Sequence, residues 1–235
     1  MSLSKDPRRL RNVTATEMSV LFGLNPFESP AKLIDKKDNP KEINNNHVRR
    51  GKIREPSVLE AFLLDGGIET ERHYGPTQVK ELDRIAATPD AYIKGTKNVV
   101  ECKTTLSNYF DKWYEAIPLY YHLQVHTQMY VMDSEEGYIG ALEEGDPREC
   151  EYRFVAWKVI PHPRIYELMV QEVSRFWELK DSGKLFRVLS PVKKEMTDLL
   201  NYTSTLIIPT TLPIKEKKED EDNELSQVLA MFNIE

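Results

Sequence analysis

Two short segments carry residue types that could hold a metal ion. Asp90 follows a proline, and Glu101 and Lys103 stand one residue apart in an apolar run. In an extended strand alternate side chains share a face, so Glu101 and Lys103 point the same way and Cys102 points the other way. Gly95 suits a tight hairpin that would return this strand beside Asp90. The sequence therefore predicts that two carboxylates and a lysine meet at one edge of a sheet.

This set of residue types suits the hydrolysis of a phosphate ester. Mg²⁺ is held by one or two carboxylates and keeps several waters for a substrate phosphate. A bound metal acidifies water and offsets charge on the phosphorus, and a nearby ammonium stabilises the transition state. The pattern of Pro-Asp, a spacer and Glu-x-Lys in an apolar strand resembles the PD-(D/E)xK nuclease superfamily. The alternative is an exposed strand face on which Glu101 and Lys103 form a modest ion pair.

Composition is typical of one globular domain. The chain has 235 residues, of which 30% are charged and 40% hydrophobic, and this length suits a single well-buried domain. We expect one nuclease domain over residues 1–200, and a linker with an acidic and apolar tail over 201–235. The two cysteines do not make a disulfide framework, and no apolar run approaches the length of a membrane span. These features predict a cytoplasmic protein without a membrane partner.

Charge is distributed unevenly along the chain. The formal net charge is −6, yet residues 1–60 carry twelve Lys or Arg and eight Asp or Glu, whereas residues 215–235 carry three lysines and seven acids. A basic N-terminal part with an acidic tail is compatible with phosphate contacts. Solvated helix faces are the alternative explanation for each arginine taken singly.

Local signals predict an α/β order of elements. Thr14 and Glu17 form a capping box that starts a helix, and Ser29 caps the next one ahead of Pro30. A longer helix from about His47 carries Glu55. The remaining predicted elements are strands at 68–74 and 83–88, helices at 106–117 and 119–132, strands at 138–142 and 152–160, and a helix at 163–180. This order predicts a central mixed β-sheet flanked by helices. The apolar stretch 225–232 is either a docking peptide or a frayed tail.

Placed in order, four blocks resemble the phage lambda-type, YqaJ-like viral recombinase exonuclease family. They are Arg9-Leu10-Arg11-Asn12-Val13-Thr14-Ala15-Thr16-Glu17, Arg50-Gly51-Lys52-Ile53-Arg54-Glu55, Thr88-Pro89-Asp90 with Glu101-Cys102-Lys103, and Tyr121-His122-Leu123-Gln124-Val125. The resemblance implies a restriction-endonuclease-like α/β core. It also implies Mg²⁺-dependent 5′→3′ digestion of one strand of double-stranded DNA, with Mn²⁺ as a substitute, which leaves 3′ overhangs for recombination. Family members form homo-trimer rings and pair with a single-strand annealing protein. By the same resemblance, this chain would be encoded by a phage or prophage and would act in the cytoplasm of a bacterial host.

The resemblance assigns roles to individual residues of the catalytic centre. Asp90 and Glu101 would be metal ligands together with the backbone carbonyl of Cys102. Lys103 would be the catalytic lysine, and Glu55 matches a helical glutamate near the metals.

Two further sets follow from the same resemblance. The helix that supports the site would contribute Gln124 and, one turn earlier, Tyr121. The 5′-phosphate of the DNA would be bound by Arg9, Arg11, Thr16 and Thr88. The family has one more arginine after the Glu-x-Lys strand, but Asn108-Tyr109 stand there in this chain, and Lys112 is nearby without being aligned.

Other functions remain open from the sequence. His122 and His126 have the spacing of a helical zinc pair, but they lack the glutamate of a zincin, and a packed or exposed histidine pair is the alternative. A second hypothesis is another nuclease of the superfamily, either an endonuclease or a single-strand-specific enzyme, which linear and circular duplexes would separate. A third is a non-catalytic DNA-binding relative, which would not need Asp90, Glu101 and Lys103 together.

Overall fold

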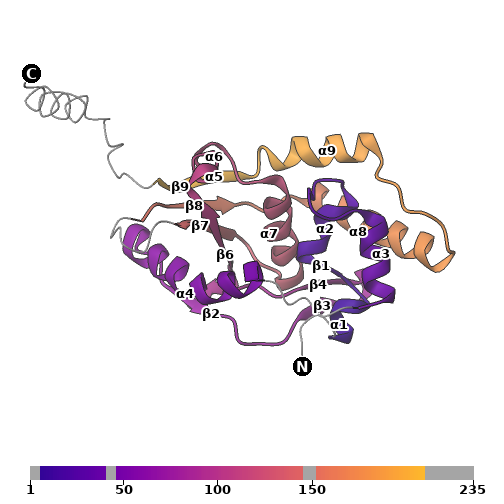
Figure 1. Cartoon of the computed structure of the whole chain (residues 1–235), viewed down its shortest axis with the longest axis horizontal. Helices are drawn as coiled ribbons and strands as arrows, with labels where there is room; N and C mark the ends of the chain where they lie inside the picture. Colours follow the sequence, from indigo (N-terminus) through magenta and orange to yellow (C-terminus); the bar gives the residue numbers. More distant parts are fainter. Residues whose placement is uncertain (1–5, 41–45, 145–151, 210–235) are drawn as a thin grey trace, which may run out of the picture.

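A computed structural model describes residues 6–40, 46–144 and 152–209 as a mixed α/β structure with two sheets (Figure 1). The larger sheet has the order β2-β5-β6-β7-β8-β9. Its strands are β2 (Thr70–Arg72), β5 (Ala91–Ile93), β6 (Val99–Leu106), β7 (Gly137–Glu144), β8 (Phe154–Val159) and β9 (Ser204–Pro209). Strands β6 and β7 are parallel and the other neighbours are antiparallel. The predicted central mixed sheet is confirmed.

Helix α7 (Leu119–Met132) makes the crossover between the two parallel strands. A parallel pair needs such a crossover, because a tight turn joins only antiparallel strands. Helix α7 has the predicted bounds: Pro118 precedes its first turn, and Asp133 ends it with a left-handed backbone (φ 52°). The segment before it forms two short helices, α5 (Ser107–Phe110) and α6 (Lys112–Glu115), where the sequence predicts one helix over 106–117.

The smaller sheet has the order β1-β4-β3, with β1 (Val13–Thr14) parallel to β4 (Ile85–Ala87) and β3 (Gln78–Lys80) antiparallel to β4. The sequence reasoning does not anticipate β3. A one-turn helix, η2 (Glu81–Asp83), joins β3 to β4. Strand β4 is followed by Thr88, Pro89 and Asp90, after which β5 begins in the larger sheet. Asp90 therefore lies where the chain passes from one sheet to the other.

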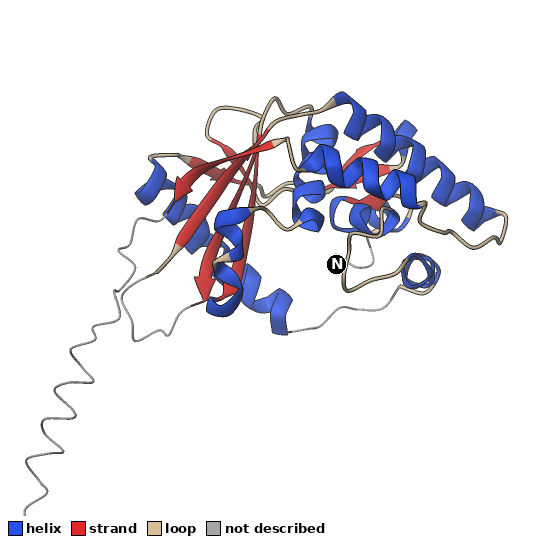
Figure 2. Ribbon diagram, turned by 90° about the horizontal axis from the view of Figure 1, so that it is seen from above, coloured by secondary structure: helices blue, strands red, loops and turns tan. Residues whose placement is uncertain are grey.

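The remaining helices cover the two sheets (Figure 2). They are α1 (Pro7–Leu10), α2 (Ala15–Leu21), α3 (Pro30–Asp38), α4 (Asn46–Gly66), α8 (Pro163–Asp181) and α9 (Ser190–Leu200). The capping box predicted for α2 is present, since Thr14 and Glu17 exchange their hydrogen bonds. The predicted Ser29 cap of α3 is present as well. None of the described helices has the length and apolar character that crossing a membrane requires.

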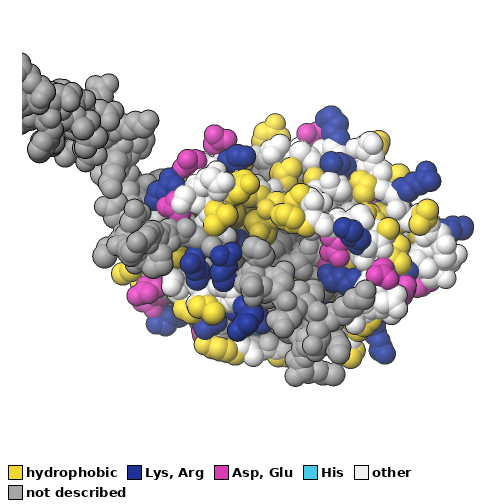
Figure 3. Space-filling view, in the orientation of Figure 1, with side chains coloured by type: hydrophobic (Ala, Val, Ile, Leu, Met, Phe, Trp, Pro, Cys, Tyr) yellow, Lys and Arg dark blue, Asp and Glu magenta, His cyan; other side chains and the backbone are white. Residues whose placement is uncertain are grey.

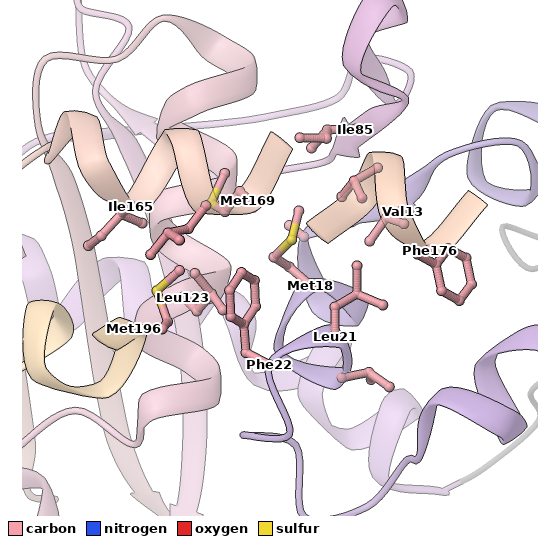
Figure 4. Close-up of a cluster of buried hydrophobic side chains, with 14 of the residues drawn as sticks. Val13, Met18, Leu21, Phe22, Ile85, Leu123, Ile165, Met169, Phe176 and Met196 are labelled. Carbon is pink, nitrogen blue, oxygen red and sulfur yellow. The ribbon is translucent and has the colours of Figure 1, made fainter. Parts of the chain in front are cut away.

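The main core lies among α2, α7 and α8 (Figure 4). Met18, Leu21 and Phe22 from α2 and its end meet Leu123 of α7 and Met169 of α8, and all five are almost completely buried. Burying each such side chain contributes roughly 1.5–3 kcal/mol. This packing fixes α7 in place against the rest of the molecule.

Two further cores lie on opposite faces of the larger sheet. Val125 and Met129 of α7 belong to one, whereas Phe62 of α4 packs edge-on against Phe154 in the other, with ring centroids 5.1 Å apart. Gly140 lets α4 approach, because a Cβ there would lie 2.6 Å from Phe62 and 2.7 Å from Phe154. The larger sheet is thus held between α4 and α7.

Residues 204–209, which the sequence predicts as the start of a linker, form the edge strand β9 beside β8. Ile208 is buried under α4, and Leu206 packs on the opposite core. Residues two positions apart share a face of a regular strand, so these two side chains reach opposite faces because the β8–β9 register shifts between Ala156 and Trp157. The predicted apolar stretch 225–232 lies outside the described residues.

Candidate active site

Glu101 is the centre of a buried polar cluster between β6 and α7. The residue is 3% exposed. Its Oε1 accepts hydrogen bonds from Lys103 Nζ at 2.5 Å and from Gln124 Nε2 at 2.5 Å. Its Oε2 accepts from Gln128 Nε2 at 2.5 Å. Both carboxylate oxygens are therefore held, one by the strand and helix together and the other by the helix alone.

Lys103 lies on the same face of β6 as Glu101, as strand alternation predicts. Its Nζ is also 3.3 Å from Gln124 Oε1 and 4.3 Å from the centroid of the Tyr121 ring. Burial alone would lower the pKa of Lys103, but the charge and hydrogen bond of Glu101 together with the charges of Tyr121 and Asp90 outweigh burial and raise that pKa above its ordinary value. The lysine therefore stays protonated at neutral pH.

Asp90 reaches the same region from the end of the β4–β5 connection. The hairpin between β5 and β6 pairs Ala91 with Val100, and Gly95 in its turn has a φ of 75°. As a result Asp90 Oδ2 accepts a hydrogen bond from the backbone N–H of Cys102 at 2.8 Å. Burial, and then the nearby charge of Glu101, raise the pKa of Asp90 well above its ordinary value. Glu101 is thus close enough to Asp90 to disfavour the charge of the Asp90 carboxylate.

Glu55 faces this cluster from α4. Its Oε1 accepts from Arg72 Nε at 3.1 Å and from Arg72 Nη2 at 2.6 Å. Glu55 also contributes to the raised pKa of Asp90, although less than burial and Glu101 do. Arg72, on the edge strand β2, was missed by sequence reasoning. Its place three residues into a short strand gives no signal that it meets a helical glutamate.

The donor set fits a hard divalent cation. Asp90 and Glu101 offer carboxylate oxygens, and β6 offers the backbone carbonyl of Cys102. Within the described ranges no group of three or more His, Cys, Asp or Glu side chains could hold a metal ion. Two carboxylates and a carbonyl are enough for Mg²⁺, which keeps several of its waters. A cation here would also offset the repulsion from Glu101, which after burial is the second cause of the raised pKa of Asp90.

The predicted 5′-phosphate residues divide into two locations. Strands β1 and β4 are parallel, and Thr14 is opposite Ala86. Thr16 and Thr88 each come two residues later, so both lie just past the carboxyl ends of these strands. Thr88 Oγ1 is 3.0 Å from Thr77 Oγ1, and Thr16 is exposed. These two hydroxyl residues lie toward Asp90.

Arg11 lies at the other ends of the same strands. With Arg8 and Arg84 it lines a cavity of about 310 Å³. Arg9 is half-buried on α1, and its backbone carbonyl accepts from Lys37 Nζ at 2.7 Å. The guanidinium groups of Arg9 and Arg11 form no ion pair with any residue in the described parts of the chain.

Gln128 is the second residue that sequence reasoning missed. It is fully buried, and its Oε1 has no hydrogen-bond partner among the described residues. It follows Gln124 by one helical turn, so the four-residue spacing was an available signal.

The histidines four residues apart on the same helix are packed, as the alternative interpretation holds. His122 and His126 are buried and share Thr203 Oγ1, at 3.3 and 3.0 Å from their Nε2 atoms.

The profile of the YqaJ-like viral recombinase domain family matches residues 6–135, more than half of the chain. The chain belongs to this family. The predicted resemblance is thereby confirmed, and the matched range contains every residue of the Glu101 cluster. The uncharacterized protein YqaJ of Bacillus subtilis is 27% identical over 182 residues, which are 74% of this chain and 55% of that protein. The chain thus spans about half the length of this YqaJ relative.

Solved structures share the fold of this YqaJ-like chain. The alkaline exonuclease LHK-Exo of Laribacter hongkongensis superimposes with a TM-score of 0.58 at 16% identity, over 81% of this chain and 96% of that one. Its complex with dAMP gives 0.59 at 18% identity over the same shares. A phage-related exonuclease from Haemophilus somnus gives 0.51 at 11% identity, over 80% of this chain and 96% of that one. At these identities the likeness establishes the fold alone.

Proposed function

We propose that this chain is a Mg²⁺-dependent nuclease that digests one strand of double-stranded DNA in the 5′→3′ direction and leaves 3′ overhangs for phage-type recombination. The observation that carries the proposal is the meeting of Asp90, Glu101 and Lys103 in one buried cluster of a YqaJ-like domain. The exonuclease activity named for LHK-Exo, which has the same fold, supports the proposal.

The proposed mechanism assigns a separate task to each side chain. A divalent cation, Mg²⁺ or Mn²⁺, held by Asp90, Glu101 and the Cys102 carbonyl would acidify water and offset charge on the phosphate. Lys103 keeps its proton because Glu101 lies beside it, so its ammonium can hold the attacking water and donate to the phosphate oxygens. Gln124 contacts both Glu101 and Lys103 and fixes their separation.

The DNA end would be held near the same cluster. In this proposal Thr16, Thr88 and Arg9 contact the 5′-phosphate, with Arg11 further along the strand ends. Tyr121 keeps the Lys103 ammonium over its ring, and Glu55 adds a carboxylate from α4. The assembly proposed for the active protein is a homo-trimer ring around the duplex, with a single-strand annealing protein as partner, in the cytoplasm of a bacterial host. Sedimentation at increasing protein concentration tests the trimer.

The decisive assay uses linear duplexes labelled at either the 5′ or the 3′ end, with Mg²⁺. The wild-type chain should release the 5′ label first, and Lys103→Ala should lower the rate by about 100-fold or more, as the loss of one positioned transition-state donor does. Lys112→Ala is the matched control, because Lys112 is an exposed lysine on the neighbouring α6. Full activity of Lys103→Ala would refute the proposed role of Lys103 in the mechanism. Cleavage of circular duplex by the wild-type chain would favour the endonuclease alternative.

A second assay concerns the 5′-phosphate. Arg9→Ala should reduce the ratio of rates on phosphorylated and hydroxyl ends, because it removes a cation with no ion-pair partner among the described residues. Arg11→Ala provides the comparison, since Arg11 lies at the opposite ends of β1 and β4 and should change the ratio less. An unaltered ratio in Arg9→Ala would exclude the phosphate role.

A further inference from the structure

A strip of aromatic rings leads from the Glu101 cluster to the surface. The Lys103 ammonium lies 4.3 Å from the centroid of Tyr121, whose ring centroid is 4.1 Å from that of Tyr120. Tyr120 is in turn 5.9 Å from Phe27, edge to face. We call Tyr121, Tyr120 and Phe27 the aromatic strip. On the face of the molecule that Figure 3 draws, hydrophobic side chains gather over the region where α7 begins in Figure 1, and Lys and Arg side chains lie nearby.

The exposed end of the strip is held by an ordered turn. Phe27 lies between α2 and α3, and the residue is 73% exposed. The Oδ1 of Asn25 accepts from the backbone N–H groups of Phe27 at 2.8 Å and Glu28 at 3.0 Å, while its Nδ2 donates to Ser19 Oγ at 3.2 Å. Single exposed hydrophobic residues are common on protein surfaces. What distinguishes Phe27 is a fixed backbone and continuous ring contacts that end at Lys103.

We propose that the aromatic strip binds an unpaired nucleobase of the DNA strand being digested, by stacking. This inference rests on the proposed function, since it takes the phosphate beside Lys103 as the one attacked. A base that stacks on Tyr120 or Phe27 then belongs to a nucleotide close to that phosphate. Stacking needs a free π-face, which every base offers once it leaves the duplex, so the strip is selective for a frayed end and tolerant of sequence.

The test measures DNA binding in EDTA, where hydrolysis does not occur. The probe is a 5′-phosphorylated duplex with a few unpaired nucleotides at the end, together with versions in which each unpaired nucleotide in turn is abasic. Phe27→Ala should bind the complete probe about fivefold or more weakly, which corresponds to the lower range of base stacking. Tyr202→Ala is the matched control, because Tyr202 is 87% exposed and lies in the α9–β9 turn.

One abasic position should weaken wild-type binding by a similar factor, and Phe27→Ala should cause no further loss on that probe. Phe27→Trp should restore binding, whereas Phe27→Leu, which keeps the apolar area without a ring, should not. Equal binding by Phe27→Ala and wild type, or the same loss on every abasic probe, would overturn the inference while leaving a nuclease that degrades DNA with Mg²⁺. A wild-type chain that neither binds the probe nor degrades DNA would overturn the proposed function as well.

Discussion

Substitution of Lys37 by methionine should destabilise the fold strongly, because its ammonium is buried among acceptors. The residue is 8% exposed, and Nζ donates to Glu17 Oε2 at 2.5 Å and to the carbonyls of Arg9 and Asn12, both at 2.7 Å. Burial would raise the pKa of Glu17, but Lys37 and Lys36 outweigh it and hold that pKa below its ordinary value. Removing Lys37 leaves a buried carboxylate and two carbonyls without this donor. Breaking a buried pair in this way costs about 3–5 kcal/mol.

Urea unfolding at pH 7 measures this loss as a free energy. Lys37→Met should lose about 3–5 kcal/mol, and the added change Glu17→Gln should recover part of it, because a neutral amide needs no counter-charge. Lys36→Met is the control. Lys36 Nζ is 3.2 Å from Glu17 Oε1, but the Lys36 side chain is 36% exposed, so the free energy of unfolding should fall by less than about 1 kcal/mol. A Lys37→Met loss no larger than that of Lys36→Met would refute the reasoning.

Two further predictions concern α7. Gln128→Met removes the donor to Oε2 of Glu101 and should weaken Mn²⁺ binding about tenfold, as the loss of an outer partner of a metal ligand does; calorimetric titration measures it, and an unchanged dissociation constant would exclude the role. Burial lowers the pKa of His122 to about 4 from its ordinary 6.5. The unfolded chain therefore binds a proton at His122 more readily than the folded chain does, so the free energy of unfolding is unaffected by this group above pH 6.5 and decreases as the pH falls toward 4. Between pH 7 and 5 that loss is about 2 kcal/mol from His122 alone. Urea midpoints at the two pH values check this prediction, and an equal pH dependence in His122→Gln would contradict it.

Elements with a local signal were predictable from the sequence. Thr14 with Glu17 fixes the start of α2, and Pro118 fixes the start of α7, because capping and proline geometry act within a few residues. The hairpin that brings Asp90 beside Cys102 followed from strand alternation and a glycine turn. These local signals were sufficient to bring Asp90, Glu101 and Lys103 together.

Features that depend on docking were not predictable in the same way. The spacing of Gln124 and Gln128 shows that they share a helix face, but which carboxylate they meet depends on how α7 packs on β6. Arg72 meets Glu55 only because β2 lies at the sheet edge next to α4. Strand β9 was missed for the same reason: its partner β8 lies far back in the chain, and its own segment is short.

The hydrogen bonds around Glu101 join residues that are only 2, 23 and 27 positions apart. Every one of these contacts closes within a single strand–helix unit, so the entropic cost of forming the cluster is that of a modest loop. Circular permutation that opens the chain between α3 and α4, outside this unit, should therefore leave the Glu101 cluster able to form.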